Sequence, residues 1–131
     1  MKKLLDITPR WFPALLMMLV IFGFSSRPGD DLPSFGGWDY FVKKGGHAVG
    51  YGLLALAYLH ALPKRNYVLA WFLALLFSAT DEFHQSFVPG RNASVIDVLV
   101  FDNLGAMAGL FIHARWSSSR ERHERHIETT R

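Results

Sequence analysis

The stretch YVLAWFLALLFSATDEFHQSF, residues 67–87, decides the fold class. Its first fourteen residues carry no charge, and it ends in a cluster of two acids, a histidine and a glutamine. An apolar run of about 17–25 residues is long enough to cross the hydrocarbon core of a bilayer as a helix. A lone strand is excluded there, because its backbone groups would lack hydrogen-bond partners in lipid. The stretch therefore predicts a membrane helix with polar residues at one end.

Comparable apolar runs lie on both sides of this stretch, and proline, glycine or basic residues separate them. They are residues 11–26, roughly 45–62 and about 93–116. We therefore predict an all-α integral membrane bundle of four transmembrane helices. Residues 1–10 would form a cytoplasmic N-terminus, residues 11–116 one transmembrane domain and residues 117–131 a charged cytoplasmic tail.

Composition agrees with a membrane protein of one domain. Half of the 131 residues are apolar and only 19% are charged, and the mean hydropathy is +0.15. The net charge of +3 is spread over short clusters between apolar runs, so we expect no nucleic-acid partner. The absence of cysteine excludes disulfides, cysteine zinc sites and thiol nucleophiles. We expect no cofactor.

Basic residues predict the orientation of the helices. Ten of the fourteen precede the first run, separate the second from the third, or follow the fourth. By the positive-inside rule, a multi-pass protein of the plasma (inner) membrane would then have both termini in the cytoplasm. Cleavage of the first run as a signal peptide remains an open alternative, because it follows Met-Lys-Lys and ends in small residues.

Seven acidic residues lie in the outer loops or in the outward half of a predicted span. They are Asp30, Asp31, Asp39, Asp81, Glu82, Asp97 and Asp102. A charge inside a span costs about 2.5–3.5 kcal/mol on insertion scales, so such residues normally face a bundle interior or a cavity. Several of them together predict a functional site that opens outward.

Helical spacing at about 100° per residue groups the polar side chains by face. Lys43, His47 and Tyr51 share one stripe of the second run, and Asp81, His84 and Gln85 share a face of the third, with Glu82 at its edge. We predict Asp81, Glu82 and His47 as acid/base groups. The predicted ligand-binding residues are Lys43, Tyr51, Gln85, Arg91 and Asp97.

Two pairs of glycines spaced four apart predict close helix packing. They are Gly46 with Gly50 in the second run and Gly105 with Gly109 in the fourth. Small residues at this spacing let two helix backbones approach each other in a membrane.

The stretch DEFHQSFVPGRNASVIDV, residues 81–98, resembles the VanZ-like family. Lys43-xxx-His47-xxx-Tyr51 upstream and Asp102-Asn103-Leu104-Gly105 downstream match as well, and the resemblance covers about residues 20–112. It implies a small bacterial membrane protein of the cell envelope, related to an accessory factor of glycopeptide (teicoplanin) resistance. The resemblance implies no particular reaction.

One spacing departs from the family pattern. Asp97 and Asp102 are five residues apart, where the family has two acids four apart on one helix face. Five residues correspond to about 140° around an α-helix, so Asp102 either leaves the shared face or returns to it through a one-residue π-type bulge. The membership of Asp102 in the site stays open.

Three classes of function fit these residues. The first is a binding or accessory factor that acts on membrane lipids, a lipid-linked envelope precursor or a lipoglycopeptide, and thereby modulates teicoplanin susceptibility. The second is a membrane-embedded acid/base enzyme for an envelope lipid, and the third, proton-coupled transport, is disfavoured by the lack of acids in the inner half.

We expect no metal. A set of His47, Glu82, His84 and Asp97 is disfavoured because Glu82-x-His84 is not a recognised ligand spacing on a helix. A homo-oligomer is left open.

Overall fold

The computed structural model describes the backbone of residues 2–130 and the side chains of residues 9–130. The described chain is all-helical, which confirms the predicted fold class at that level. Its main helices are α1 (Lys2–Ser25), α2 (Asp39–Ala61), α3 (Tyr67–Gln85) and α4 (Asn103–Thr129), and the π-helix η4 (Asp97–Asp102) runs directly into α4. Short 3-10 turns are η1 (Gly29–Asp31), η2 (Gly36–Trp38) and η3 (Pro63–Arg65).

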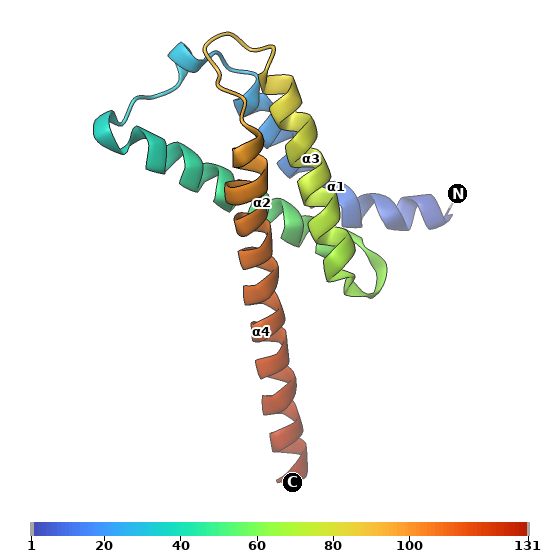
Figure 1. The fold of residues 1–131 in the computed structure, drawn as a ribbon. Coiled ribbons are helices and arrows are strands. Elements are labelled where there is room, and N and C mark those ends of the chain that lie inside the picture. The colour runs from blue at the N-terminus through green and yellow to red at the C-terminus, as the bar shows by residue number, and fades with distance from the viewer. Residues whose placement is uncertain (1, 131) are drawn as a thin grey trace.

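Two helices extend beyond their predicted limits. Helix α1 begins at Lys2 and includes most of the predicted N-terminal segment, of which Met1 lies outside the described residues. Helix α4 continues to Thr129, so the charged tail is helical from residue 117 to that point, and Arg131 lies outside the described residues. In Figure 1 this second half of α4 projects alone beyond the other helices. Alternating charges and good helix formers, unbroken by proline or glycine, sustain the helix there without tertiary contacts.

Helix α2 is the centre of the bundle, because it contacts α1, α3 and α4. In Figure 1 it crosses α4, and the loops that follow α1 and α3 meet at one end of the molecule. The core consists largely of small side chains around Tyr51 and Leu54. Ala55, Ala70 and Ala106 are fully buried, so the three helices that carry them can approach closely.

Glycine packing at the crossing of α2 and α4 differs in part from the prediction. A Cβ on Gly105 would overlap the carbonyl oxygen of Ala48, and one on Gly109 would lie 2.9 Å from the carbonyl oxygen of Gly52. The predicted role of Gly105 and Gly109 is therefore confirmed. Close packing at Gly46 and Gly50 is not found: no atom lies within 4 Å of a Cβ on Gly46, and the nearest to one on Gly50 is the Ile21 side chain of α1 at 3.9 Å. Two residues further along α2, Ala48 and Gly52 form a second face of small residues, and this face packs against α4.

The π-helix resolves the spacing of Asp97 and Asp102. The backbone N–H of Asn103 donates to the carbonyl of Val98, five residues earlier. Residues five apart stack on one face of such a turn, whereas in an α-helix they diverge. Both aspartates are buried, with Asp102 only 1% exposed. The sequence left open whether Asp102 leaves the face of Asp97 or returns to it through a π-type bulge, and the structure contains the bulge.

One helix among the described residues is both long and apolar enough to cross a membrane. It is the continuous segment Asp97–Thr129, formed by η4 and α4. Residues Pro9–Ser25 of α1 form a shorter apolar helix. Across the described chain, more large hydrophobic side chains are exposed than are buried in the core.

Candidate functional site

The site lies at the end of the bundle where two loops are joined. The N–H of Gly29 donates to the carbonyl of Pro89 over 3.1 Å. A Cβ on Gly29 would overlap the carbonyl oxygen of Gly90, and Gly90 itself has φ = +71°. Both positions therefore favour glycine, which has no Cβ and tolerates positive φ. This joint holds Arg91, the next residue, over the ends of the helices.

Asp81 ties three helices together beneath the joint. Its Oδ2 accepts hydrogen bonds from Ser25 Oγ at 2.6 Å, Tyr51 OH at 3.1 Å and Gln85 Nε2 at 3.1 Å. Gln85 also donates to Ser25 Oγ at 3.0 Å. Asp81 is 2% exposed, so a carboxylate with three donors fixes the relative positions of α1, α2 and α3. Three predicted site residues meet here, and Ser25 joins them.

His47 belongs to a second cluster, which connects α2, α3 and η4. Its Nδ1 lies 3.3 Å from Asp102 Oδ1, while Ser78 Oγ donates to Asp102 Oδ2 over 2.5 Å. A carboxylate can only accept, so this contact favours a proton on Nδ1 and leaves Nε2 for another partner. Asp102 is therefore a site residue, reached through the π-turn.

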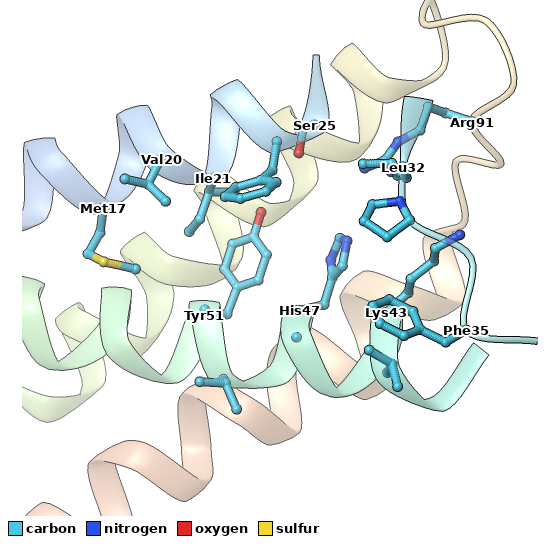
Figure 2. A pocket seen from close by; sticks show the side chains of 16 residues that line it. Met17, Val20, Ile21, Ser25, Leu32, Phe35, Lys43, His47, Tyr51 and Arg91 are labelled. Atoms are coloured by element: carbon cyan, nitrogen blue, oxygen red, sulfur yellow. The ribbon is translucent and has the colours of Figure 1, made fainter. Parts of the chain in front are cut away.

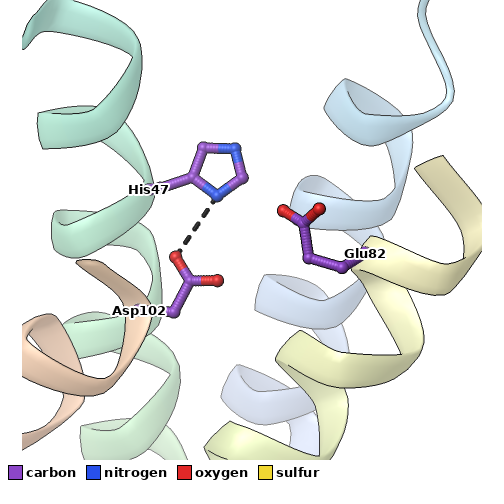
Figure 3. Close-up of side chains that lie close together, drawn as sticks. All are labelled: His47, Glu82 and Asp102. Carbon is purple, nitrogen blue, oxygen red and sulfur yellow. Dashed lines mark hydrogen bonds and ion pairs between the residues drawn. The ribbon is translucent and has the colours of Figure 1, made fainter. Parts of the chain in front are cut away.

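Glu82 completes this cluster from α3. Its Oε2 accepts a hydrogen bond from the backbone N–H of Ser94 at 2.9 Å. Its Oε1 is buried and has no hydrogen-bond partner among the described residues. Figure 3 shows the carboxylate of Glu82 pointing toward His47 and Asp102, and donor atoms of the three side chains lie within 4.8 Å of one another.

Basic residues surround the mouth of the site. Lys44 forms an ion pair with Asp97, and Lys43 pairs with Asp39 at 2.7 Å. The hydrogen bond from Lys43 holds the pKa of the Asp39 carboxyl, which lies before the predicted span, below its usual value. The Nε of Arg91 is buried without a partner in the described part of the chain. Asp97 thus neutralises Lys44, a residue that the sequence analysis did not single out, although it directly follows the predicted Lys43.

His84 lies apart from both clusters. Its ring stacks on Phe22 of α1, with centroids 4.4 Å apart, and its Nε2 lies 3.1 Å from Ser26 Oγ. The predicted face shared with Asp81 spans too wide an arc of α3 for all its members to point into the site. His84 instead faces the outer side of α1.

Two adjoining cavities open at this end of the molecule. The apolar groove, about 370 Å³, runs between α1 and α2 and is lined by side chains such as Met17, Ile21 and Val49 (Figure 2). The polar cavity, about 250 Å³, is lined by Lys44, Gln85, Asn92 and Asp97, among others. Residues that line both are Leu32, Lys43, His47 and Arg91.

Comparison with known proteins identifies one related family. A family model described as VanZ/LLP1 matches residues 10–117, a range that includes every residue of the two clusters and both cavities. No curated protein and no solved structure gives a match.

Proposed function

The chain belongs to the VanZ/LLP1 family, and from this premise we propose that it is a four-span membrane protein that binds a lipid with a phosphate head group. The site would face outward from the plasma membrane, with both chain termini in the cytoplasm. Its role would be that of an accessory factor for envelope lipids or lipid-linked precursors.

Exposed apolar side chains support the membrane part of this proposal. Phe12, Leu19, Phe72 and Phe111 belong to three different helices and are all more than half exposed. A water-soluble bundle of this size rarely leaves so much apolar surface uncovered. Helices α2 and α3 carry the polar site residues at their outer ends, where the bundle interior accommodates them.

The contact between the apolar groove and the polar cavity carries the lipid proposal. An amphiphile needs an apolar channel for its chain directly beside a polar chamber for its head group, and His47, Lys43 and Arg91 border both. Val49 and Phe24 line the groove and are 64% and 62% exposed, so the groove is accessible from the side. A lipid could enter from the surrounding bilayer without leaving it.

Charge favours a phosphate head group over a neutral one. Three cationic side chains, Lys43, Lys44 and Arg91, line the polar cavity. The two lysines are paired with acids, whereas Arg91 has a buried Nε that no described residue satisfies. A guanidinium binds phosphate oxygens with two parallel hydrogen bonds, which gives both affinity and orientation.

Lipid binding by the purified full chain tests the proposal. A polyisoprenyl monophosphate, phosphatidylglycerol and an uncharged diacylglycerol would be titrated in one neutral detergent, with inorganic phosphate as a competitor. We expect Arg91→Gln to weaken both phosphate lipids about tenfold, in line with the loss of a charge-assisted bidentate contact. Arg27→Gln, at an outward arginine that lines neither cavity, should leave binding unchanged.

Two outcomes would refute this reading. Equal affinity for the charged and uncharged lipids would remove the head-group specificity. Full displacement by inorganic phosphate would mean that the groove contributes nothing and that the ligand is a free anion.

The same variants test the accessory role. In a Gram-positive host without relatives of this protein, we expect wild type to shift susceptibility to teicoplanin, whose lipid tail inserts in the membrane, more than to vancomycin. Arg91→Gln should lose that shift at equal membrane abundance, and Arg27→Gln should keep it. No shift from well-expressed wild type would remove the antibiotic role while leaving lipid binding intact.

A second candidate function, an acid/base enzyme for the same lipid, is favoured by the pairing of His47 with Asp102. A histidine whose Nδ1 is held by a carboxylate presents a basic Nε2, and His47 borders both cavities. Turnover of a bound lipid that is abolished in His47→Gln, with affinity retained, would support catalysis. Recovery of unchanged lipid after prolonged incubation would favour binding alone.

A further inference from the structure

We propose that His47, Glu82 and Asp102 bind a divalent transition-metal cation, of which Mn²⁺ and Zn²⁺ fit the donors best. The inference rests on this cluster alone and holds whether or not a lipid fills the groove. It departs from the sequence-based expectation of no metal.

Three different elements bring the donors together. His47 comes from α2, Glu82 from α3 and Asp102 from η4, and one donor atom of each lies within 4.8 Å of the other two. Figure 3 shows the three side chains converging on a common space. The π-turn is required for this arrangement, because a regular α-helix would rotate Asp102 away from the face of Asp97.

Each carboxylate has one oxygen held by the protein and another that faces the cluster. Ser94 N–H binds Glu82 Oε2, and Ser78 Oγ binds Asp102 Oδ2. The remaining oxygens are Glu82 Oε1, which is buried and lacks a partner among residues 9–130, and Asp102 Oδ1, whose contact with His47 Nδ1 a shared cation would replace. Outer hydrogen bonds of this kind orient carboxylates for a metal. Glu82 is only 6% exposed, so an unpaired oxygen there carries a desolvation cost that a cation would remove.

The negative charge of the buried carboxylates also favours a bound cation. Glu82 and Asp102 place two carboxylates in a poorly hydrated space, and Asp81 and Asp97 are buried nearby on the same elements. Lys44 is already paired with Asp97, and Lys43 with Asp39. A proton on His47 would balance one negative charge, whereas a divalent cation balances two.

Donor chemistry narrows the choice of metal. One imidazole nitrogen with two carboxylate oxygens suits Mn²⁺ or Zn²⁺, while Ca²⁺ requires six to eight oxygen ligands. Three protein ligands leave coordination positions free, as in sites that bind water or substrate. His47 borders the polar cavity, so a metal here would be accessible to a phosphate that enters it. His84 and Asp97, which the sequence offered as ligands, are instead engaged with Phe22 and Lys44.

Metal titration of the full chain in a neutral detergent, after treatment with a chelator and without added lipid, tests the site. We expect one Mn²⁺ per chain, competed by Zn²⁺, with about tenfold or greater loss of affinity in Glu82→Gln and in Asp102→Asn. Asp39→Asn is the matched control, since it removes an acid of the same end that lies outside the cluster. Circular dichroism would verify that each variant is folded.

A spectroscopic signature provides a second test that does not depend on the two carboxylate variants. Pulsed electron paramagnetic resonance of Mn²⁺-loaded wild type should show coupling to one imidazole ¹⁴N, which His47→Gln should abolish. Absence of stoichiometric binding, absence of the nitrogen coupling, or equal loss in Asp39→Asn would overturn the proposal. Lipid binding by wild type and by Arg91→Gln in excess chelator separates the two hypotheses, because the effect of Arg91 there reports on the lipid site without a metal.

Discussion

The two halves of α2 differ in what surrounds them. Residues 39–50 include no buried residue, whereas eight of the eleven residues in Tyr51–Ala61 are buried. The first half borders both cavities, the second contains the buried residues, and α4 crosses α2 between them at Ala48 and Gly52. Figure 1 shows the first half diverging from the other helices. One helix thus has an open, cavity-lining start and a buried end, and the clusters around His47 and Tyr51 lie where the two halves meet.

The largest expected effect comes from adding a methyl group where α4 crosses α2. Gly105→Ala places a Cβ against the backbone of Ala48, which cannot move without shifting the whole helix. We expect a loss of about 2–3 kcal/mol in the free energy of unfolding, as for an overpacked core. Titration with sodium dodecyl sulfate in mixed micelles, followed by tryptophan fluorescence, would measure it.

Gly45→Ala is the control in the diverging half of α2. No atom lies within 4 Å of a Cβ at this position. The same substitution should therefore change the free energy of unfolding by less than about 1 kcal/mol, and in the stabilising direction, because alanine favours helix. Equal destabilisation by the two variants would show that α2 is packed no more tightly at its crossing with α4 than at its start.

The sequence placed Asp81, Gln85 and Tyr51 in one outward site because helical spacing grouped them with other polar residues on the faces of two helices. Asp81 and Gln85 are four apart on one turn, and Tyr51 extends a stripe of α2. The all-helical class followed in the same way from long apolar runs. Periodicity along a single helix is thus readable before the structure is known.

What the sequence could not settle depends on contacts between helices. The sequence pointed to Gly46 and Gly50, whereas the position of α4 selects Ala48 and Gly52 two residues further along. Asp102 depended on a π-turn that changes the angle between residues, which spacing could not decide. His84 shares a helical face with Asp81, yet the approach of α1 gives it Phe22 as a neighbour.

Loss of the Asp81 carboxylate should be the second largest effect, because it removes the shared acceptor that joins α1, α2 and α3. Asp81→Ala leaves the hydroxyl groups of Ser25 and Tyr51 buried without their acceptor, while Gln85 keeps its hydrogen bond to Ser25 Oγ. We expect destabilisation of about 2 kcal/mol, against about 1 kcal/mol for Tyr51→Phe, which removes a single donor. Thermal unfolding in detergent would rank the two, and an equal cost would contradict a role for Asp81 as the shared acceptor.

The smallest effect concerns the exposed start of α2, where Asp39 pairs with Lys43. The lysine lowers the pKa of Asp39 in the folded state. The pair therefore stabilises the fold above the ordinary carboxyl pKa of about 3.9, and this contribution is lost as the pH falls through the folded-state value. Wild type and Asp39→Asn should thus differ slightly in unfolding temperature near neutral pH and converge in acid. Because the pair is exposed, salt should reduce the difference, and a difference that survived high salt would mean that this half of α2 is more buried than the structure shows.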